Sequence, residues 1–118
     1  MKGRIVLSVS AVIMSQLVAS LITPAHAENG VASVYSTDSG SKTASGQSLN
    51  PGALTAAHRT LPFGTKVHVT NKKNGHSVVV TINDRGPFVR GRVIDVTPAG
   101  ARALGFSGLT QVTLRVGE

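Results

Sequence analysis

The sequence contains no cysteine and no tryptophan. Without cysteine the chain can form no disulfide bond and cannot carry a lipid at a lipobox, so a lipid anchor is excluded. Beyond the first 27 residues the only aromatic residues are Tyr35, Phe63, Phe88 and Phe106. A nucleic-acid-binding surface needs rings on which bases stack or a recognisable motif, and neither is present. We therefore expect no nucleic-acid partner.

Acidic residues are also scarce. Five Asp and Glu stand against twelve Lys and Arg, and the formal net charge is +7. A basic balance of this kind favours anionic surroundings. In an exported protein these would be cell-wall polymers more than nucleic acid.

The first 27 residues have the pattern of a signal peptide. Lys2 and Arg4 precede an uncharged, mostly apolar stretch that extends to Ile22, and Ala25-His26-Ala27 ends it with the small-x-small pattern that signal peptidase recognises. The alternative is an uncleaved membrane anchor, which fits less well because serines and a glutamine dilute the apolar stretch. We expect cleavage after Ala27, a mature domain of residues 28–118, and a periplasmic or secreted protein that is not a lipoprotein.

Short alternating segments dominate the mature chain and predict strands. The predicted strands cover residues 30–36, 66–70, 77–82, 92–96 and 110–116, with a short ambiguous element at 53–58 and a helix at 99–104. Thr97 can cap this helix and Gly105 can end it. Residues 37–51 are rich in Ser, Gly and Asn and predict a long loop that is either disordered or functional. This pattern indicates a mainly β fold, a small barrel with one short helix.

The most informative segment is Asn83-Asp84-Arg85-Gly86-Pro87-Phe88, which follows the most apolar strand pattern. Gly86-Pro87 requires a turn. A carboxylate held by a rigid turn at the mouth of a sheet is one way to present a proton donor. Alternatively, Asp84 only hydrogen-bonds its own turn. The segment alone leaves both interpretations open.

Several further motifs occur in one order along the mature chain. They are Thr43-Ala44-Ser45-Gly46, Leu54-Thr55-Ala56-Ala57-His58, Leu61-Pro62-Phe63-Gly64-Thr65, Val69-Thr70-Asn71, Asn74-Gly75 and, after the Asp84 segment, Gly91-Arg92-Val93-Ile94-Asp95-Val96. This set resembles the rare lipoprotein A (RlpA) family over essentially the whole mature chain. The resemblance implies a six-stranded double-psi β-barrel and a lytic transglycosylase that cuts peptidoglycan glycan strands, best when they lack stem peptides. It also implies kinship with expansins and barwin-type proteins, which share the barrel and a groove for polysaccharide.

The resemblance assigns roles to particular residues. Asp84 matches the family's active-site Asp and His58 its groove His, so the resemblance implies that both are catalytic, with His58 orienting Asp84 or binding sugar. The family's second acid is a Glu, and its position here is Gln47. The lipobox Cys and the carboxy-terminal peptidoglycan-binding repeat domain of the family have no counterpart in this sequence. Asp95 lies in the middle of a predicted strand, and we expect it to accept hydrogen bonds from the backbone or from Arg92 inside the barrel.

We expect Gln47, Tyr35, Arg85 and Phe88 to contact the glycan. A lytic transglycosylase adds no water, because the muramic C6 hydroxyl attacks C1, so one carboxylate can act first as acid and then as base. Burial against an apolar wall such as Phe88 would help Asp84 to hold a proton, whereas a close Arg85 head would favour the ionised form. Gln47 can bind a sugar hydroxyl but cannot transfer a proton.

Two functions therefore remain open, together with a minor third. The first is a peptidoglycan lytic transglycosylase, and the second is a weak or inactive peptidoglycan-binding or wall-loosening module. The third is a small exported inhibitor. The His and Asp residues show no metal-ligand spacing, so we expect neither a metal nor another cofactor. We also expect a monomer.

Overall fold

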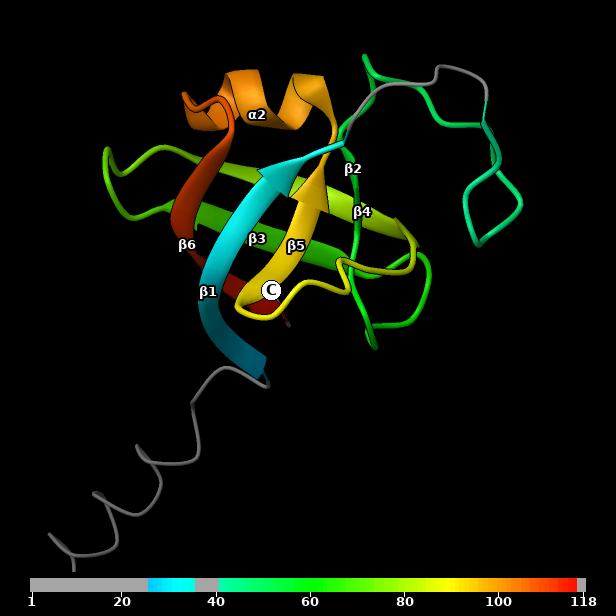
Figure 1. Cartoon of the computed structure of the whole chain (residues 1–118), viewed down its shortest axis with the longest axis horizontal. Helices are drawn as coiled ribbons and strands as arrows, with labels where there is room; N and C mark the ends of the chain where they lie inside the picture. Colours follow the sequence, from blue (N-terminus) through cyan, green and yellow to red (C-terminus); the bar gives the residue numbers. More distant parts are fainter. Residues whose placement is uncertain (1–25, 36–40, 117–118) are drawn as a thin grey trace, which may run out of the picture.

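The structure, a computed structural model, describes residues 26–35 and 41–116. Six strands close into a barrel that carries one short helix, as the sequence predicts (Figure 1). The elements are β1 (His26–Val34), β2 (Thr55–Ala57), β3 (Lys66–Asn71), β4 (Ser77–Asp84), β5 (Arg92–Val96), α2 (Pro98–Leu104) and β6 (Leu109–Val116). The predicted signal peptide lies outside the described residues, except for its last two residues, which belong to β1.

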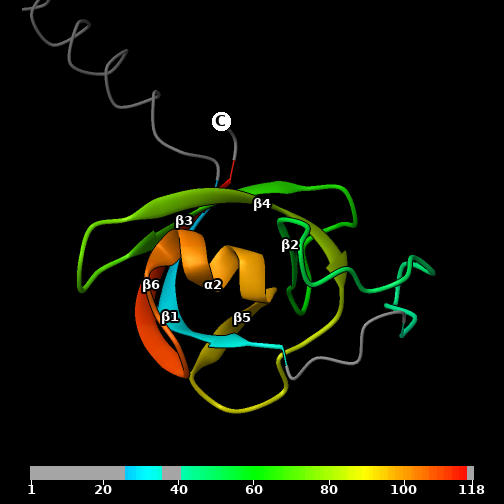
Figure 2. The same ribbon diagram turned by 90° about the horizontal axis from the view of Figure 1, so that it is seen from above.

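The strand order around the barrel is β1-β5-β2-β4-β3-β6. Two pairings, β1 with β5 and β2 with β4, are parallel, and the other four are antiparallel. Viewed from above, α2 lies across the ring of strands and covers one end of it (Figure 2). Within the described ranges, no helix is long and apolar enough to cross a membrane.

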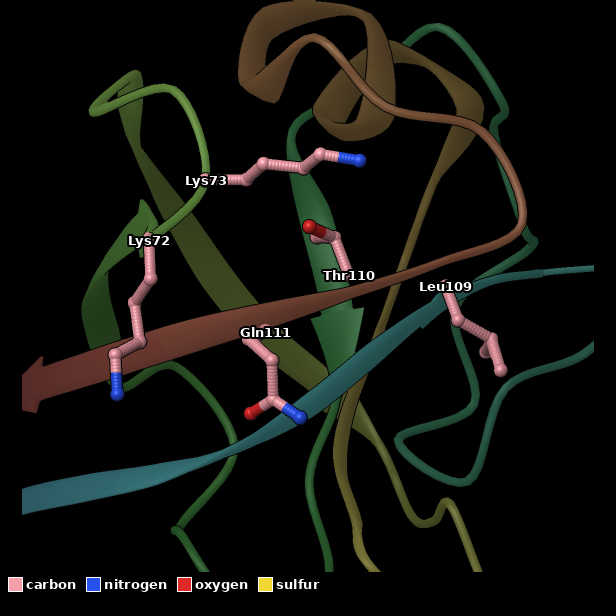
Figure 3. A pocket seen from close by; sticks show the side chains of 5 residues that line it. All are labelled: Lys72, Lys73, Leu109, Thr110 and Gln111. Atoms are coloured by element: carbon pink, nitrogen blue, oxygen red, sulfur yellow. The ribbon is translucent and has the colours of Figure 1, made fainter.

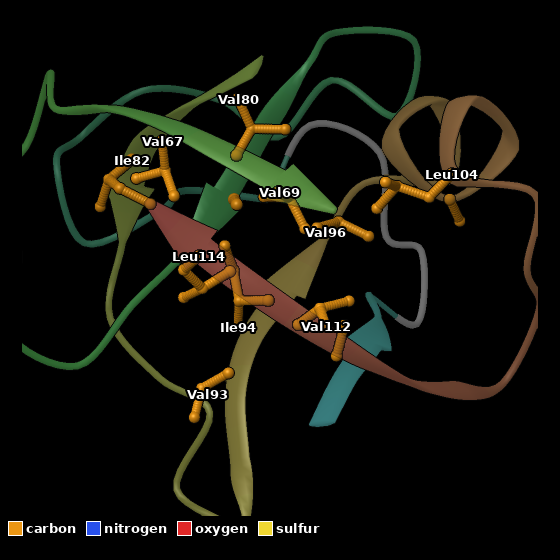
Figure 4. Close-up of a cluster of buried hydrophobic side chains, with 13 residues drawn as sticks. Val67, Val69, Val80, Ile82, Val93, Ile94, Val96, Leu104, Val112 and Leu114 are labelled. Atoms are coloured by element: carbon orange, nitrogen blue, oxygen red, sulfur yellow. The ribbon is translucent and has the colours of Figure 1, made fainter. Parts of the chain in front are cut away.

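Aliphatic side chains fill the interior of the barrel (Figure 4). The alternation in β3 and β4 points Val67, Val69, Val80 and Ile82 inward, and all four are fully buried. Side chains of Ile94, Val96, Leu104, Val112 and Leu114 complete this core, again without exposed surface. An interior so filled leaves no room for a ligand, so any binding site must lie on the outer wall or in the loops.

Three element boundaries differ from the prediction in ways that matter for the site. The ambiguous segment contains β2, which sits between β4 and β5. The predicted 77–82 strand continues to Asp84 because β2 pairs with it as far as this residue. The first strand begins earlier than residue 30, because the antiparallel pairing with β6 extends down to His26.

The helix forms where the sequence predicts it. Thr97 Oγ1 accepts a hydrogen bond from the Gly100 amide at 3.2 Å, and Gly105 ends the helix with φ 72°. The Thr97 hydroxyl also donates to the Ala53 carbonyl oxygen at 2.6 Å. Thr97 therefore connects the helix to the segment that leads into β2.

Replacing Thr97 tests this connection. Because Thr97 is 0% exposed, Thr97→Ala removes a cap and leaves the Ala53 carbonyl oxygen without its donor. We expect the free energy of unfolding, measured in denaturant, to fall by about 2 kcal/mol. Thr97→Ser keeps the hydroxyl and should lose less than half of this. Equal losses in the two variants would show that the methyl group, and not the hydroxyl, matters.

Candidate active site

Two carboxylates lie on the outer wall of the barrel, on either side of β2. Ala57 pairs with Asp84 of β4 across one edge of β2 and with Asp95 of β5 across the other. Two strand spacings place the Cα atoms of Asp84 and Asp95 roughly 10 Å apart. Ser33 of β1 pairs with Asp95, and its hydroxyl donates to Asp95 Oδ1. One row therefore crosses four adjacent strands, and all but Ala57 of its members are polar; we call it the polar row.

Three donors from different parts of the chain meet at the Asp84 carboxylate. The Tyr35 hydroxyl donates to Oδ2 at 3.0 Å. The backbone amides of Ala44 and Arg85 donate to Oδ1 at 2.8 and 2.9 Å. The bond to its own turn, expected as the alternative role of Asp84, thus exists alongside long-range bonds that fix the carboxylate on the wall.

Tyr35 follows the end of β1 and is half-buried. Burial, followed by the hydrogen bond to Asp84 and the negative charges of Asp84 and Asp95, raises the pKa of the Tyr35 phenol far above its ordinary value. The phenol therefore stays protonated and acts as a donor to Asp84. The Tyr35 backbone amide donates to the Val96 carbonyl oxygen at 2.9 Å, which places Tyr35 beside the residue that follows Asp95.

The loop before β2 is anchored beside Asp84. The Ser45 amide donates to the Asn83 carbonyl oxygen at 3.2 Å, and the Asn83 side-chain amide donates to Gln47 Oε1 at 3.2 Å. Gln47 is itself exposed. These bonds hold the Gln47 side chain next to the residue that precedes Asp84.

A pocket of about 270 Å³ opens at this position. Its lining consists of Ser45, Gln47, Phe63, Gly64, Thr81, Ile82 and Asn83. Gln47, which the sequence predicts to contact the glycan, therefore lines a pocket that reaches the residue before Asp84 on β4.

His58 is 4% exposed, and both of its ring nitrogens are engaged. Nδ1 accepts from the backbone amides of Thr60 and Leu61 at 3.1 and 3.2 Å, so the proton must be on Nε2, which donates to Glu28 Oε1 at 2.9 Å. The backbone amide of His58 donates to the Asp84 carbonyl oxygen at 3.2 Å. In this geometry the His58 backbone holds its segment next to Asp84, and the ring is occupied by protein partners. Glu28 belongs to no recognisable motif, and only folding brings it to His58.

Arg85 does not direct its guanidinium at Asp84. Its Nη1 donates to the carbonyl oxygens of His58 and Leu61 at 3.1 and 2.8 Å, and its Cζ lies 4.1 Å from the centroid of the Phe63 ring. Only its backbone amide contacts the carboxylate. The structure thus ties Arg85 and Phe63 into one surface unit beside the pocket.

Phe88 lies over Gly86, where a Cβ atom would be 3.5 Å from its ring, and it remains 78% exposed. It therefore does not form the expected apolar wall that buries Asp84. An exposed ring in this position is instead available to contact a ligand.

The site has no evident place for a metal. Across residues 26–35 and 41–116, no three His, Cys, Asp or Glu side chains gather in a way that could hold a metal ion. Asp84, Asp95 and Glu28 are instead bonded to Tyr35, Ser33 and His58 respectively.

Comparison with known proteins identifies relatives of this barrel. The profile of a family described as "Lytic transglycolase" matches residues 27–116. The protein named "Probable endolytic peptidoglycan transglycosylase RlpA" in Nostoc sp. (strain PCC 7120) is 56% identical over 90 residues, which is 74% of this chain and 24% of that protein. "Endolytic peptidoglycan transglycosylase RlpA" of Pasteurella multocida is 52% identical over 84 residues, 70% of this chain and 29% of that protein. The chain thus spans about a quarter of the length of these relatives.

A solved structure shows the same fold. The Clavibacter michiganensis expansin superposes with a TM-score of 0.62 at 22% sequence identity, and the match covers 79% of this chain and 51% of that one. The identity is low, so this likeness concerns the double-psi β-barrel alone.

The ionisation of Tyr35 tests the geometry around Asp84. Tyr35 is the only tyrosine and there is no tryptophan, so tyrosinate absorbance reports this residue alone. We expect no tyrosinate in the folded protein at a pH one unit above the ordinary value of about 10. Asp84→Asn removes a charge that raises the pKa, so ionisation should begin at lower pH in that variant. Ordinary ionisation near pH 10 in the folded wild type would contradict the placement of Tyr35.

Proposed function

Because this chain belongs to the RlpA family of lytic transglycosylases, we propose that its barrel cleaves the glycan strands of peptidoglycan, with Asp84 as the acid and base. The observation that carries this proposal is the convergence of three donors on one carboxylate, on an outer wall that a long polymer can reach. Family membership supports strands without stem peptides as the preferred form. The substrate requires export, which the predicted signal peptide would provide.

In this proposal Oδ2 of Asp84 moves the proton. Oδ1 already accepts two backbone amides, so a proton on the carboxyl group must reside on Oδ2. Oδ2 gives this proton to the glycosidic oxygen as the bond from C1 breaks. It then takes the proton of the muramic C6 hydroxyl as that oxygen bonds to C1. The products are a strand end with a free hydroxyl and a 1,6-anhydromuramyl end, and no water is consumed.

Tyr35 supports both halves of this cycle. Its hydroxyl donates to Oδ2, so it stabilises the carboxylate that forms when the proton leaves. When Oδ2 is protonated, the phenol oxygen can accept instead, because a hydroxyl does both. The raised pKa of Tyr35 keeps its own proton in place through the cycle.

Exposed rings and amides on either side of Asp84 would hold the strand. Phe88 stands on the turn after Asp84, and Phe63 with Arg85 stands beside the pocket that Gln47 lines. Rings contact the apolar faces of sugars, and the Gln47 amide can bond sugar hydroxyls.

One observation favours a second function. The Gln47 side chain is hydrogen-bonded to Asn83, the residue that directly precedes Asp84. An amide at this position cannot transfer a proton. If turnover needs an acid at this position, the barrel would bind peptidoglycan and cut it slowly or not at all. We rank this weak binding or wall-loosening module second.

Replacing Asp84 separates catalysis from binding. Asp84→Asn keeps the shape and one acceptor oxygen but cannot cycle a proton, so we expect at least about a 100-fold loss of anhydromuramyl products from naked glycan strands, measured by mass spectrometry. Asp95→Asn is the matched control. It leaves all three donors to Asp84 in place, so it should reduce turnover less. Equal loss in both variants would argue against Asp84 as the sole acid and base.

Replacing Gln47 tests the second function. A Glu at this position can still accept from the Asn83 amide, and it adds a group that can exchange protons. We expect Gln47→Glu to raise turnover of naked glycan by roughly an order of magnitude over wild type. Ser48→Glu adds the same charge one residue away and should leave turnover unchanged. Robust wild-type turnover that Gln47→Glu does not alter would show that an amide at position 47 does not reduce catalysis.

A further inference from the structure

The pocket beside Asp84 is built from three separate segments of the chain. Ser45 and Gln47 come from the loop before β2, Phe63 and Gly64 from the β2–β3 connection, and Thr81, Ile82 and Asn83 from β4. We call it the Gln47 pocket. At about 270 Å³ it is smaller than the clefts of roughly 300–1,000 Å³ that enclose whole drug-sized ligands. Its size therefore suits one substituent of a sugar better than a whole oligosaccharide.

We propose that the Gln47 pocket binds the 2-acetamido group of a glycan sugar and thereby fixes the register of the strand at Asp84. The identity of the polymer rests on the proposed function, whereas the preference for an acetamido group rests on the lining of the pocket. Every sugar of a naked peptidoglycan strand carries such a group, so the proposed substrate always presents it.

Backbone hydrogen bonds hold the walls of the pocket. The Gly64 amide donates to the Ile82 carbonyl oxygen at 2.7 Å, and the Ile82 amide donates to the Thr65 carbonyl oxygen at 2.9 Å. On the other side, the Ser45 amide donates to the Asn83 carbonyl oxygen. These bonds join both loops to β4. A pocket preformed in this way lowers the entropy that is lost when a ligand binds.

The lining favours a neutral ligand group. Every lining residue that the structure describes is uncharged. The nearby Lys66 ammonium donates to Thr81 Oγ1 at 2.9 Å, and the Arg85 guanidinium donates to two backbone carbonyl oxygens. A charged ligand group would lose water in this pocket without meeting an opposite charge in its lining. A neutral amide carries no such cost.

Two carboxamides supply the polar contacts. Asn83 Nδ2 donates to Gln47 Oε1 at 3.2 Å, which leaves Gln47 Nε2 as a donor. Asn83 is 6% exposed, and its Oδ1 is buried and accepts no hydrogen bond within residues 26–35 and 41–116. A buried acceptor without a donor is rare and destabilising.

An acetamido group complements this pair of amides. Its carbonyl oxygen can accept from Gln47 Nε2, and its N–H is the donor that Asn83 Oδ1 lacks. The Gln47 side chain is exposed, and Asn83 provides its one hydrogen-bond partner among the described residues. It can therefore turn to admit the N–H to the buried oxygen.

An apolar surface beside the amides suits the acetamido methyl group. The Phe63 ring is 43% exposed, and Arg85 Cζ lies 4.1 Å from its centroid. Gly64 follows with φ 92°, which disfavours any larger residue. A Cβ atom added there would meet no heavy atom within 4 Å beyond its chain neighbours, so the space over Gly64 is open. The methyl group can pack on the ring next to this space.

Binding of one substituent here would decide where the strand is cut. Asn83 directly precedes Asp84, so a sugar anchored in the pocket is held at a fixed place relative to the carboxylate. A regular polymer without an anchor can slide along the wall. Anchoring brings a glycosidic oxygen to the same position in each bound strand, which supplies part of the orientation that catalysis requires.

A larger hollow elsewhere lacks this convergence of groups. It measures about 530 Å³ and lies between the β3–β4 turn and β6. Its two ammonium groups, on Lys72 and Lys73, point apart (Figure 3). Gln111 also lines this hollow and is exposed, so it provides a matched control for Gln47.

Titration of the isotopically labelled full chain with neutral trisaccharides, followed by amide NMR shifts, tests the proposal. The probe is tri-N-acetylchitotriose. The matched ligand is cellotriose, which has a hydroxyl in place of each acetamido group. We expect chitotriose to shift the amides of residues 45–47, 63–64 and 81–83 and to bind at least about tenfold more tightly than cellotriose.

Variants at position 47 identify the group that recognises the ligand. Gln47→Leu removes the donor, so it should lower the affinity for chitotriose about tenfold and leave that for cellotriose within about twofold of wild type. Gln111→Leu makes the same change in the other hollow and should bind as wild type. Gln47→Glu also lacks the donor, so it should raise the KM for naked strands several-fold even though kcat increases.

The outcomes separate this site from the proposed activity. Equal binding of the two trisaccharides, binding of neither, or chitotriose affinity that Gln47→Leu retains would overturn the acetamido site. If naked strands are still cut in that case, the proposed activity stands without it. Selective chitotriose binding by a barrel that cuts no glycan would refute the activity and leave the acetamido site standing.

Discussion

The candidate site depends on three residues, Thr55–Ala57, which form a strand between β4 and β5. Ala57 pairs on both sides, so it sets the separation of Asp84 and Asp95. The hydrophobic interior enforces this register on β5, because a shift of one residue would turn buried Val96 outward and Asp95 inward. The core and the polar row are therefore two faces of the same pairing.

Neutral groups donate the hydrogen bonds to both carboxylates of this row. Asp84 accepts from a phenol and two backbone amides, and Asp95 accepts from a hydroxyl. The Arg85 guanidinium donates to carbonyl oxygens instead of Asp84. The donors to Asp84 come from three different segments and fix the position of its carboxylate, which an acid and base in one residue requires.

Much of this architecture is predictable from the sequence, and the limits have physical causes. The β3 and β4 patterns alternate because one face is buried, and the helix carries its own cap and stop, so these elements follow from local chemistry. β2 is too short for a periodic pattern, and its strand character comes only from two distant partners. Asp84 was recognisable from its turn and motif. The bond from Tyr35 spans 49 positions, and the Glu28 to His58 bond spans 30, so neither leaves a local signal. The interpretation of Asp95 is wrong in its partner, because Asp95 accepts from the Ser33 hydroxyl on the outer wall and not from Arg92 inside the barrel.

The most direct test of the central claim, that Asp84 alone serves as acid and base without water, is a digest of naked glycan strands in water labelled with heavy oxygen. Mass spectrometry of the wild-type products should show 1,6-anhydromuramyl ends that carry no label. Labelled reducing ends would mean that water attacks C1 and that the barrel is a hydrolase. Strands that remain intact while the protein binds them would contradict the account and leave a binding module.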